Sequence, residues 1–292
     1  MENLKGILFM ILAMAGFACE DLFIKMLSTN LPVSEIIIIL GFSGSLIFLA
    51  IGLTTKAPIF HKDILSMPIV VRTLCELFGA LFFVLAIALT PLSSASAILQ
   101  VVPLLVTIGA AIFFKEKVGW RRWSAVVAGF LGVLLILRPG FGSFMPASIF
   151  ALLGAIFLAG RDLATRAIKV KLPSVIISLY AFLAFGLSGI FIIPFSPEML
   201  MPSSNEIIYF AGASAFGVIA YYSIVIAARV GEMSVISPFR YSRLVFAMIL
   251  SIVVLSERPD MWTFLGAAII VASGVYTFIR ENLMGKTKER IL

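Results

Sequence analysis

The amino-acid sequence predicts an all-α polytopic membrane protein in which ten transmembrane helices form two inverted five-helix repeats. Three observations predict this fold class: the composition, the number of long apolar segments, and an internal similarity at one constant offset. Of the 292 residues, 61% are hydrophobic and 13% are charged, and the mean hydropathy is +1.14, far too apolar for a water-soluble domain. The basic residues that give the net charge of +7 lie between apolar segments, so we expect no nucleic-acid partner.

Ten apolar segments are long enough to cross a bilayer, which requires about 20 mostly apolar residues in a helix. Short polar or Pro/Gly-containing stretches separate them. The predicted segments are 5–28, 33–53, 65–89, 93–114, 122–138, 147–168, 174–194, 205–228, 234–255 and 261–280. The first segment follows Lys5, as the apolar part of a signal peptide follows a basic residue, but it recurs in an internal repeat and is therefore interpreted as a permanent helix.

Lys and Arg residues are distributed unequally between alternate connections, which predicts the orientation because cytoplasmic loops hold the excess. With the N-terminus inside, sixteen of the 22 basic residues are cytoplasmic. Only Arg138 and Arg258 fall on the opposite side, and the other four lie within predicted segments. We therefore expect a multi-pass protein of the cell (inner) membrane with both termini in the cytoplasm.

The two halves of the sequence match at a constant offset of 141 residues, the difference between positions 21 and 162. The matching positions are Asp21 and Asp162, Leu31–Pro32 and Leu172–Pro173, Ser93 and Ser234, and Glu116 and Glu257. Because each half holds an odd number of helices, the second half enters the membrane in the opposite sense. We expect residues 1–141 to form the first repeat and residues 142–292 the second, which ends in a short basic cytoplasmic tail.

The end of each half carries the features of a known family. An apolar helix is followed by an acidic turn, KEKVGW in the first half and SERPDMW in the second, and then by a Gly-rich helix. This arrangement resembles the EamA family of the drug/metabolite transporter superfamily over nearly the whole chain. The resemblance implies a secondary transporter that moves small organic metabolites through a central cavity by alternating access. The stretches EDLFIK and PFRYSRL look like the branch that includes bacterial S-adenosylmethionine and riboflavin carriers.

Two arginines in the ninth segment are the leading candidates for solute binding. An arginine near the bilayer centre costs about 3 kcal/mol to insert, so it usually faces a protein interior or a watery cavity. Arg240 and Arg243 would share one helix face, with Tyr241 turned about 100° away, and Pro238 is expected to break the helix. We expect the arginines to bind an anionic or aromatic part of the solute, and Tyr241 to stack on it. In the alternative, Arg240 snorkels to the interface and Arg243 pairs with an acid for structural reasons.

The third segment contains Arg72 and Glu76, which are four residues apart and able to pair on one helix face. Glu76 is a candidate for proton coupling or gating, because a carboxylate in a site of low dielectric constant binds a proton more readily. Mutual neutralisation alone is the alternative. Glu20, in the first segment, has no obvious partner there and is expected to pair with Arg240 or Arg243.

Two further charge pairs with the same spacing occupy equivalent places in the two halves. They are Asp21 with Lys25 and Asp162 with Arg166. The inverted repeat places the first pair near the outer face and the second near the inner face. We expect the pairs to brace or latch the opposite gates of the cavity; the alternative is that each pair only helps its own helix to insert.

The remaining candidates are uncharged. Gln100 lies in the fourth segment at the position that corresponds to Tyr241 and is a candidate polar ligand, and Pro103 is expected to kink that helix. Several aromatic residues are candidates for a pocket lining, although aromatic residues in membrane helices commonly serve in helix contacts or as interface anchors. The set is Tyr221, Tyr222, Phe78, Phe82 and Phe83, of which Tyr222 and Phe78 are assigned to the pocket.

The chain offers little for enzyme chemistry or metal binding. His61 is the only histidine, and Cys19 and Cys75 are the only cysteines, so neither a Cys/His metal site nor a disulfide framework is expected. The stretches GFSG at Gly41–Gly44 and GLSG at Gly186–Gly189 resemble intramembrane protease motifs, but a loop histidine cannot act as their base. Small-residue helix contacts explain both stretches. No ATP-binding motif and no cofactor site is recognised.

The sequence therefore predicts a secondary transporter rather than an enzyme. Its expected partners are a small-molecule solute and membrane lipids, and both a monomer and a homodimer are compatible with the sequence. A carrier specific for riboflavin or S-adenosylmethionine is a narrower alternative. A membrane-embedded enzyme, such as a protease or an acyltransferase, is the alternative from another class.

Overall fold

The chain folds into long helices, and the computed structural model describes residues 2–116, 118–138, 145–168, 172–230 and 236–289. Every regular element in these ranges is a helix, as the sequence predicts. The first half forms α1 (Glu2–Leu27), α2 (Val33–Thr54), α3 (Met67–Leu89), α4 (Leu92–Leu99), α5 (Val102–Phe113) and α6 (Trp120–Leu137). The second half forms α7 (Ser148–Ala167), α8 (Ser174–Phe191), α9 (Ser204–Val230), α11 (Ser242–Val253) and α12 (Met261–Glu289). The short 3₁₀ helices are η1 (Lys62–Leu65), η2 (Ile193–Phe195) and η3 (Ser237–Tyr241).

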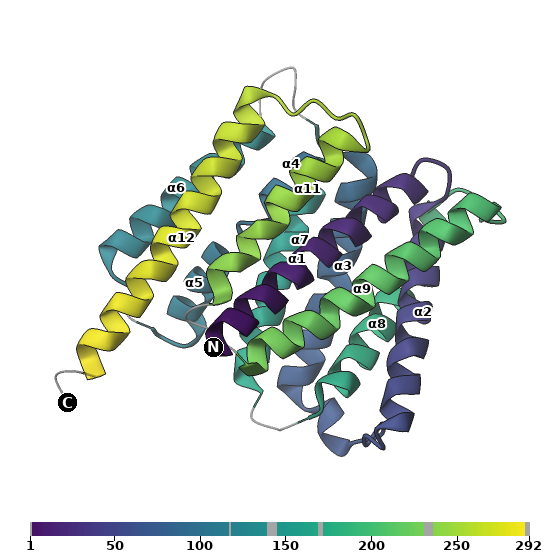
Figure 1. The fold of residues 1–292 in the computed structure, drawn as a ribbon, viewed down its shortest axis with the longest axis horizontal. Helices are drawn as coiled ribbons and strands as arrows, with labels where there is room; N and C mark the ends of the chain where they lie inside the picture. The colour runs from purple at the N-terminus through teal and green to yellow at the C-terminus, as the bar shows by residue number, and fades with distance from the viewer. Residues whose placement is uncertain (1, 117, 139–144, 169–171, 231–235, 290–292) are drawn as a thin grey trace.

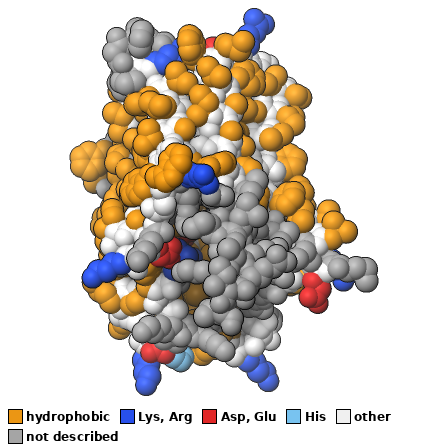
Figure 2. Space-filling model, turned by 90° about the vertical axis from the view of Figure 1, so that its left-hand side faces the viewer, with side chains coloured by type: hydrophobic (Ala, Val, Ile, Leu, Met, Phe, Trp, Pro, Cys, Tyr) orange, Lys and Arg blue, Asp and Glu red, His pale blue; other side chains and the backbone are white. Residues whose placement is uncertain are grey.

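Length and composition identify the parts of the chain that cross a membrane. Among the described residues, the six long apolar spans are Leu4–Leu27, Val33–Thr54, Met67–Leu89, Leu92–Phe113, Ser148–Ala167 and Ser204–Ile224. Three shorter apolar helices are Trp123–Leu137, Val175–Phe191 and Met261–Tyr276. Figure 2 shows hydrophobic side chains over much of the visible surface, with Lys and Arg side chains mainly towards its ends. The protein is therefore a multi-pass membrane protein.

The segments predicted at 93–114 and 234–255 are not continuous α-helices. In the first, α4 and α5 are separated at Gln100–Val101, just before Pro103, which has no N–H group to continue the helical hydrogen bonds. In the second, Pro238 lies in η3, which leads directly into α11. Both breaks occur where the prolines led us to expect them, but each divides its segment into two helices.

Helices from the two halves of the chain pack in reciprocal pairs. α1 packs along α9 and α3 along α7, and these pairs are counterparts because the offset of 141 residues carries α1 onto α7 and α3 onto α9. α2 packs along α8, α4 along α11, and α6 along α12. In Figure 1, α6 and α12 form one side of the molecule and α2 and α8 the other, with α1, α9 and α11 between them. The interface between the halves therefore runs through the whole bundle.

The start of α1 and the end of α12 lie at the same end of the bundle (Figure 1). An even number of membrane crossings places both ends of a chain on one side. The connection between α11 and α12 lies at the opposite end. The molecule thus has one end that carries both termini and one that does not.

Close approach of α2 and α8 depends on glycine. A Cβ atom on Gly41 would overlap the backbone nitrogen of Gly186, so only glycine fits at this crossing. The two stretches therefore meet through their first glycines, Gly41 and Gly186, in a small-residue helix contact. Gly52, further along α2, is different, because its Cβ would make only an ordinary contact with a Val175 methyl group at 3.7 Å.

Gly41→Ala is expected to lower the melting temperature of the protein purified in detergent. The added methyl group forces α2 and α8 apart, at a cost of about 1–3 kcal/mol. Gly52→Ala is the matched control in the same helix and is expected to leave the melting temperature unchanged or slightly raised, because alanine favours the helix over glycine. Thermal unfolding followed by circular dichroism compares the proteins, and equal melting temperatures for the two variants would contradict the close crossing.

Candidate functional site

Five charged side chains in the middle of the bundle form one connected group, here called the charge cluster. Its members are Arg72 and Glu76 on α3, Arg161 and Asp162 on α7, and Arg240 on η3. The successive ion pairs are Arg72–Glu76 at 3.4 Å, Glu76–Arg161 at 3.1 Å, Arg161–Asp162 at 2.8 Å and Asp162–Arg240 at 3.7 Å. The Arg72–Glu76 pair forms as predicted, and the link from Glu76 to Arg161 connects the two halves of the chain.

Mutual compensation makes these charges tolerable inside a membrane protein. Removing an ion from water costs several kcal/mol unless an opposite charge and hydrogen bonds replace the solvent. Glu76 lies between Arg72 and Arg161, and Asp162 lies between Arg161 and Arg240. With three guanidinium groups and two carboxylates, the charge cluster holds one positive charge in excess.

A second ionic contact links Arg243 of α11 to Asp21 of α1. The Nε and Nη2 groups of Arg243 donate to the Asp21 carboxylate at 2.8 to 3.1 Å. The guanidinium carbon also lies 5.1 Å from the ring centre of Phe17 and 5.3 Å from that of Phe83, which adds cation–π attraction. Arg243 therefore ties the second half of the chain to two helices of the first half.

The two arginines of the ninth segment do not form a single anion-binding wall, contrary to the expectation from their spacing. Arg240 faces Asp162, whereas Arg243 faces Asp21. The equivalent aspartates of the two halves approach the η3–α11 segment separately, and each attracts its own arginine. Arg240 is held more loosely, by one contact at 3.7 Å, and 34% of its side chain is exposed. Of the two, Arg240 is the arginine with room for a solute.

The expected pairs Asp21–Lys25 and Asp162–Arg166 do not form. Arg166 lies 3.6 Å from Glu116 instead. Lys25 donates hydrogen bonds at 2.8 to 3.2 Å to three carbonyl oxygens at the C-terminal end of α3, those of Ile87, Ala88 and Thr90. This end of a helix favours a cation. Both aspartates pair with guanidinium groups, which match the geometry of a carboxylate better than an ammonium group does.

The sequence predicted that Glu20 pairs with Arg240 or Arg243. In the structure it pairs with neither. Its carboxylate lies over Gly217 of α9, where an added Cβ would be 2.6 Å from Oε1. Among the described residues, this carboxylate has no hydrogen bond or ion pair. The side chain is neither fully buried nor fully exposed.

Tyr241 and Gln100 are both buried, each 6% exposed. The Tyr241 ring points towards α12, because a Cβ on Gly274 would overlap its hydroxyl group. This hydroxyl has no hydrogen-bond partner among the described residues. Gln100 lies at the break between α4 and α5. Both side chains are therefore packed inside the bundle, and the Tyr241 ring offers little exposed surface on which a solute can stack.

Tyr221, rather than Tyr222, joins the charge cluster. Its hydroxyl accepts a hydrogen bond from Nη2 of Arg72 at 3.3 Å. Its ring packs edge-on against Phe48 and Phe182, with ring centres 5.7 and 6.0 Å apart. Tyr222, the next residue on the helix, points about 100° away and is 62% exposed. Two adjacent tyrosines cannot face the same way on a helix, and the amino-acid pattern alone does not show which of them faces the charged residues.

Phe78 belongs to a row of aromatic rings between α3 and α7. Its ring centre lies 6.4 Å from that of Phe82 and 5.2 Å from that of Phe157, and Phe82 stacks on Phe150 at 6.0 Å. These separations are typical of favourable ring contacts. The row holds the two helices of the charge cluster together, and Phe78 is partly exposed at its end.

Arg161 was among the sixteen basic residues predicted to be cytoplasmic, but it is a member of the charge cluster. It lies inside α7, and both of its neighbours in the cluster are acids. The intramembrane position of Arg161 could have been predicted from the offset of 141 residues, because this offset matches Arg161 to Glu20, which was already placed within a membrane segment. A charged residue at both equivalent positions indicates an intramembrane position for both.

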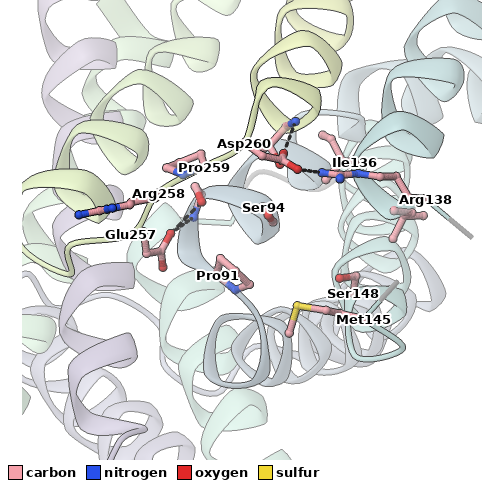
Figure 3. A pocket seen from close by; sticks show the side chains of 13 residues that line it. Pro91, Ser94, Ile136, Arg138, Met145, Ser148, Glu257, Arg258, Pro259 and Asp260 are labelled. Carbon is pink, nitrogen blue, oxygen red and sulfur yellow. Dashed lines mark hydrogen bonds and ion pairs between the residues drawn. The ribbon is translucent and has the colours of Figure 1, made fainter. Parts of the chain in front are cut away.

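A cavity of about 410 Å³ is lined in part by the α11–α12 connection, which lies at the end of the bundle away from the termini (Figure 1); Figure 3 shows the residues around it. Glu257, from the acidic turn, accepts hydrogen bonds there from the backbone N–H groups of Leu92 and Ser93 and from the Ser93 hydroxyl, at 2.7 to 3.1 Å. A carboxylate at the start of a helix satisfies free N–H groups and favours the helix dipole. The acidic turn therefore acts as an N-terminal cap of α4.

Asp260 has a similar role at the same cavity. It accepts hydrogen bonds from the backbone N–H and the hydroxyl of Thr263 at 2.9 and 2.8 Å and pairs with Arg138 across the cavity (Figure 3). Partial burial raises the pKa of Asp260, but the hydrogen bonds from Arg138 and Thr263 outweigh it and hold the pKa below its ordinary value. The charged residues at this end thus fasten helices to one another.

Metal binding finds no support in the part of the chain that the structure describes. There, no three His, Cys, Asp or Glu side chains come together in a group that could hold a metal ion. Asp21, Glu76 and Asp162 are instead paired with arginines.

Long apolar helices in two related halves, with compensated charges buried between them, are typical of a membrane transport protein. The profile of the EamA-like transporter family matches residues 4–138 and again residues 145–279. The chain belongs to this family and is a transporter, not an enzyme. The two matched stretches begin 141 residues apart (145 minus 4), the same offset that relates Asp21 to Asp162.

Several characterised relatives are similar to the chain over most of its length. An S-adenosylmethionine uptake transporter of Rickettsia conorii is 25% identical over 96% of this chain and 94% of the relative. A riboflavin transporter of Vibrio cholerae is 28% identical over 69% of this chain and 67% of the relative. The pseudopaline exporter CntI of Pseudomonas aeruginosa is 25% identical over 92% of this chain and 94% of the relative. A solved crystal structure shares the fold with a TM-score of 0.63 at 20% identity, covering 97% of this chain and 98% of its own.

Asp21→Ala is expected to destabilise the protein by about 3 kcal/mol, because it leaves the Arg243 charge unpaired inside the bundle. Glu116→Ala, which removes one partner of an exposed ion pair, is the control and should cost less than about 1 kcal/mol. The double variant Asp21→Ala, Arg243→Leu should recover part of the loss, since no charge is left without a partner. Thermal unfolding in detergent measures all three, and equal effects of Asp21→Ala and Glu116→Ala would refute the assignment.

Proposed function

We propose that this EamA-family protein is a secondary transporter that moves a small organic metabolite with an anionic or aromatic portion by alternating access between two inverted repeats. The charge cluster is the observation that carries the proposal. Ionic and hydrogen-bonded contacts between α3 and α7, and between α3 and α9, span the interface of the halves. Such contacts exchange partners with water or with a solute more readily than interlocked apolar side chains do.

Arg240 is the proposed ligand for the anionic part of the solute. Its only ionic partner in the described structure is Asp162. If Arg240 turns away, Asp162 remains paired with Arg161, which lies closer to it. A solute carboxylate or phosphate therefore replaces one weak contact without leaving Asp162 unpaired. Arg243, which is bound by Asp21 and two aromatic rings, is proposed as a coupling residue that connects the halves instead.

The gating residues of the proposal are those that link helices. Lys25 fastens α1 to the end of α3, and Arg166 faces Glu116 near the end that carries the termini. We propose that these contacts open and close at opposite ends of the cavity during transport. The excess of basic residues in alternate connections supports a cytoplasmic position for both termini, which lie at one end of the bundle (Figure 1).

The relatives suggest solutes for the first tests. S-Adenosylmethionine and riboflavin both have an aromatic ring system, and S-adenosylmethionine also has a carboxylate, so each contains a group that the proposed site recognises. The relatives include an uptake protein and an exporter, and alternating access works in either direction. Glu76, Glu20 and Asp21 are the proposed candidates if transport is coupled to protons.

Arg240→Ala is expected to reduce the uptake of a recognised solute into proteoliposomes at least tenfold, mainly by raising KM. Arg240→Lys should retain part of the activity, because lysine keeps the charge but not the planar fork. Arg121→Ala, which removes an exposed arginine, is the matched control. The measurement is uptake of radiolabelled S-adenosylmethionine and riboflavin, with organic anions as further solutes. Unchanged uptake by Arg240→Ala would remove the site assignment, and no uptake of any solute by the wild type would remove the proposed function.

A further inference from the structure

Eight charged side chains inside the bundle form two groups with opposite net charge. The charge cluster has three guanidinium groups and two carboxylates. The second group comprises Arg243, Asp21 and Glu20, in which one guanidinium group faces two carboxylates and pairs with only one of them. One positive and one negative charge are therefore left in excess at different places. Because an uncompensated charge is costly inside a membrane protein, each place favours a ligand of opposite charge.

Comparison of the two equivalent helix pairs shows why Glu20 has no partner. In the α3–α7 pair, Glu76 and Arg161 form an ion pair at 3.1 Å. The offset of 141 residues carries Glu20 onto Arg161 and Glu76 onto Gly217, so the α1–α9 pair has an acid where its counterpart has a base, and a glycine where its counterpart has an acid. The two helices of the α1–α9 pair meet at the equivalent point, but this pair has no residue equivalent in charge to Arg161 there.

The geometry at this meeting point keeps the carboxylate accessible. Glu20 Oε1 and Oε2 lie 2.6 and 3.2 Å from the place that a Cβ of Gly217 would occupy, so the absence of a side chain at Gly217 makes room for the carboxylate. Phe23 lies one helical turn after Glu20, and Phe216 directly precedes Gly217. Their ring centres are 6.0 Å apart, and the two rings add an apolar wall. The Glu20 carboxylate lies against these apolar side chains, is partly exposed, and has no hydrogen bond or ion pair among the described residues. Such a carboxylate is suited to an organic ammonium or sulfonium group.

We propose that Glu20, seated on Gly217, binds the cationic group of the transported solute. The proposal rests on the proposed function, and it narrows the substrate class. The solute is a zwitterion whose ammonium or sulfonium group lies at Glu20 and whose anionic group lies at Arg240. Binding then compensates both excess charges at once, whereas a simple anion or a neutral ring system compensates one or neither.

The test compares matched ligands on matched variants. S-Adenosylmethionine and S-adenosylhomocysteine differ in the methyl group that makes the sulfur cationic, and L-methionine differs from its 2-hydroxy analogue in the ammonium group. Affinity is measured by thermal stabilisation of the purified protein, since a bound ligand raises the melting temperature by mass action. The variants are Glu20→Gln, Gly217→Ala, which displaces the carboxylate without removing it, and Glu198→Gln, which removes an exposed carboxylate as the control.

The wild type and Glu198→Gln are expected to bind the more cationic member of at least one pair about tenfold more tightly. Glu20→Gln should abolish this preference, and Gly217→Ala should weaken it. In the absence of ligand, Glu20→Gln should melt at the same or a higher temperature than the wild type, unlike Asp21→Ala, because it removes a charge that has no partner. A preference that survives in Glu20→Gln, or a wild type that binds no cationic member more tightly, overturns the proposal.

Proteoliposome uptake separates this proposal from the proposed function. If the wild type and Glu20→Gln both transport riboflavin or an organic anion, but no preference for cationic solutes exists, the cation site is wrong and the transporter assignment stands. If the wild type transports none of the solutes, including the zwitterions, the proposed function and the inference fall together.

Discussion

Compensation of charge inside an apolar bundle is the constraint on which the rest of this structure depends. The two charged groups inside the bundle contain four arginines and four acids, and an ion there is costly unless its opposite lies beside it. The ion pair between Glu76 and Arg161, and that between Asp21 and Arg243, join helices from different halves of the chain. The same contacts that make the charges tolerable therefore hold the two repeats together, and a conformational change between the repeats has to rearrange them.

The inverted repeat supplies a symmetrical scaffold, and substitutions within it supply the chemistry. Asp21 and Asp162 are equivalent, but the residues that they meet are not, because Arg240 and Arg243 correspond to the apolar residues Leu99 and Val102 of the first half. One segment, η3–α11, thus carries the cations for the aspartates of both repeats. This asymmetric set of charges on a symmetrical set of helices is the basis of our proposal that the solute carries separate positive and negative groups.

The fold and the broken helices could be predicted from the sequence, whereas the partners of the charged residues could not. Apolar length predicts spans, and Pro103 and Pro238 predict the breaks, because both depend on local backbone chemistry. The spacing of four residues predicted Arg72–Glu76 correctly but predicted Asp21–Lys25 and Asp162–Arg166 wrongly. Spacing lists only the partners that one helix can offer at that spacing. Asp21 is bound instead by the guanidinium group of Arg243 from another helix, and Asp162 by the adjacent Arg161 and by Arg240.

The sequence by itself determined the membrane-spanning helical architecture, its division into two related halves and the set of charged residues within it, since these follow from composition, hydropathy and a constant offset. The tertiary structure alone decided which arginine meets which acid, that Tyr221 rather than Tyr222 joins them, and that Glu20 rests on Gly217 without an ion pair or hydrogen bond among the described residues. The physical reason is that hydropathy is a property of each segment, whereas compensation of a buried charge depends on the distance between atoms that the chain places far apart.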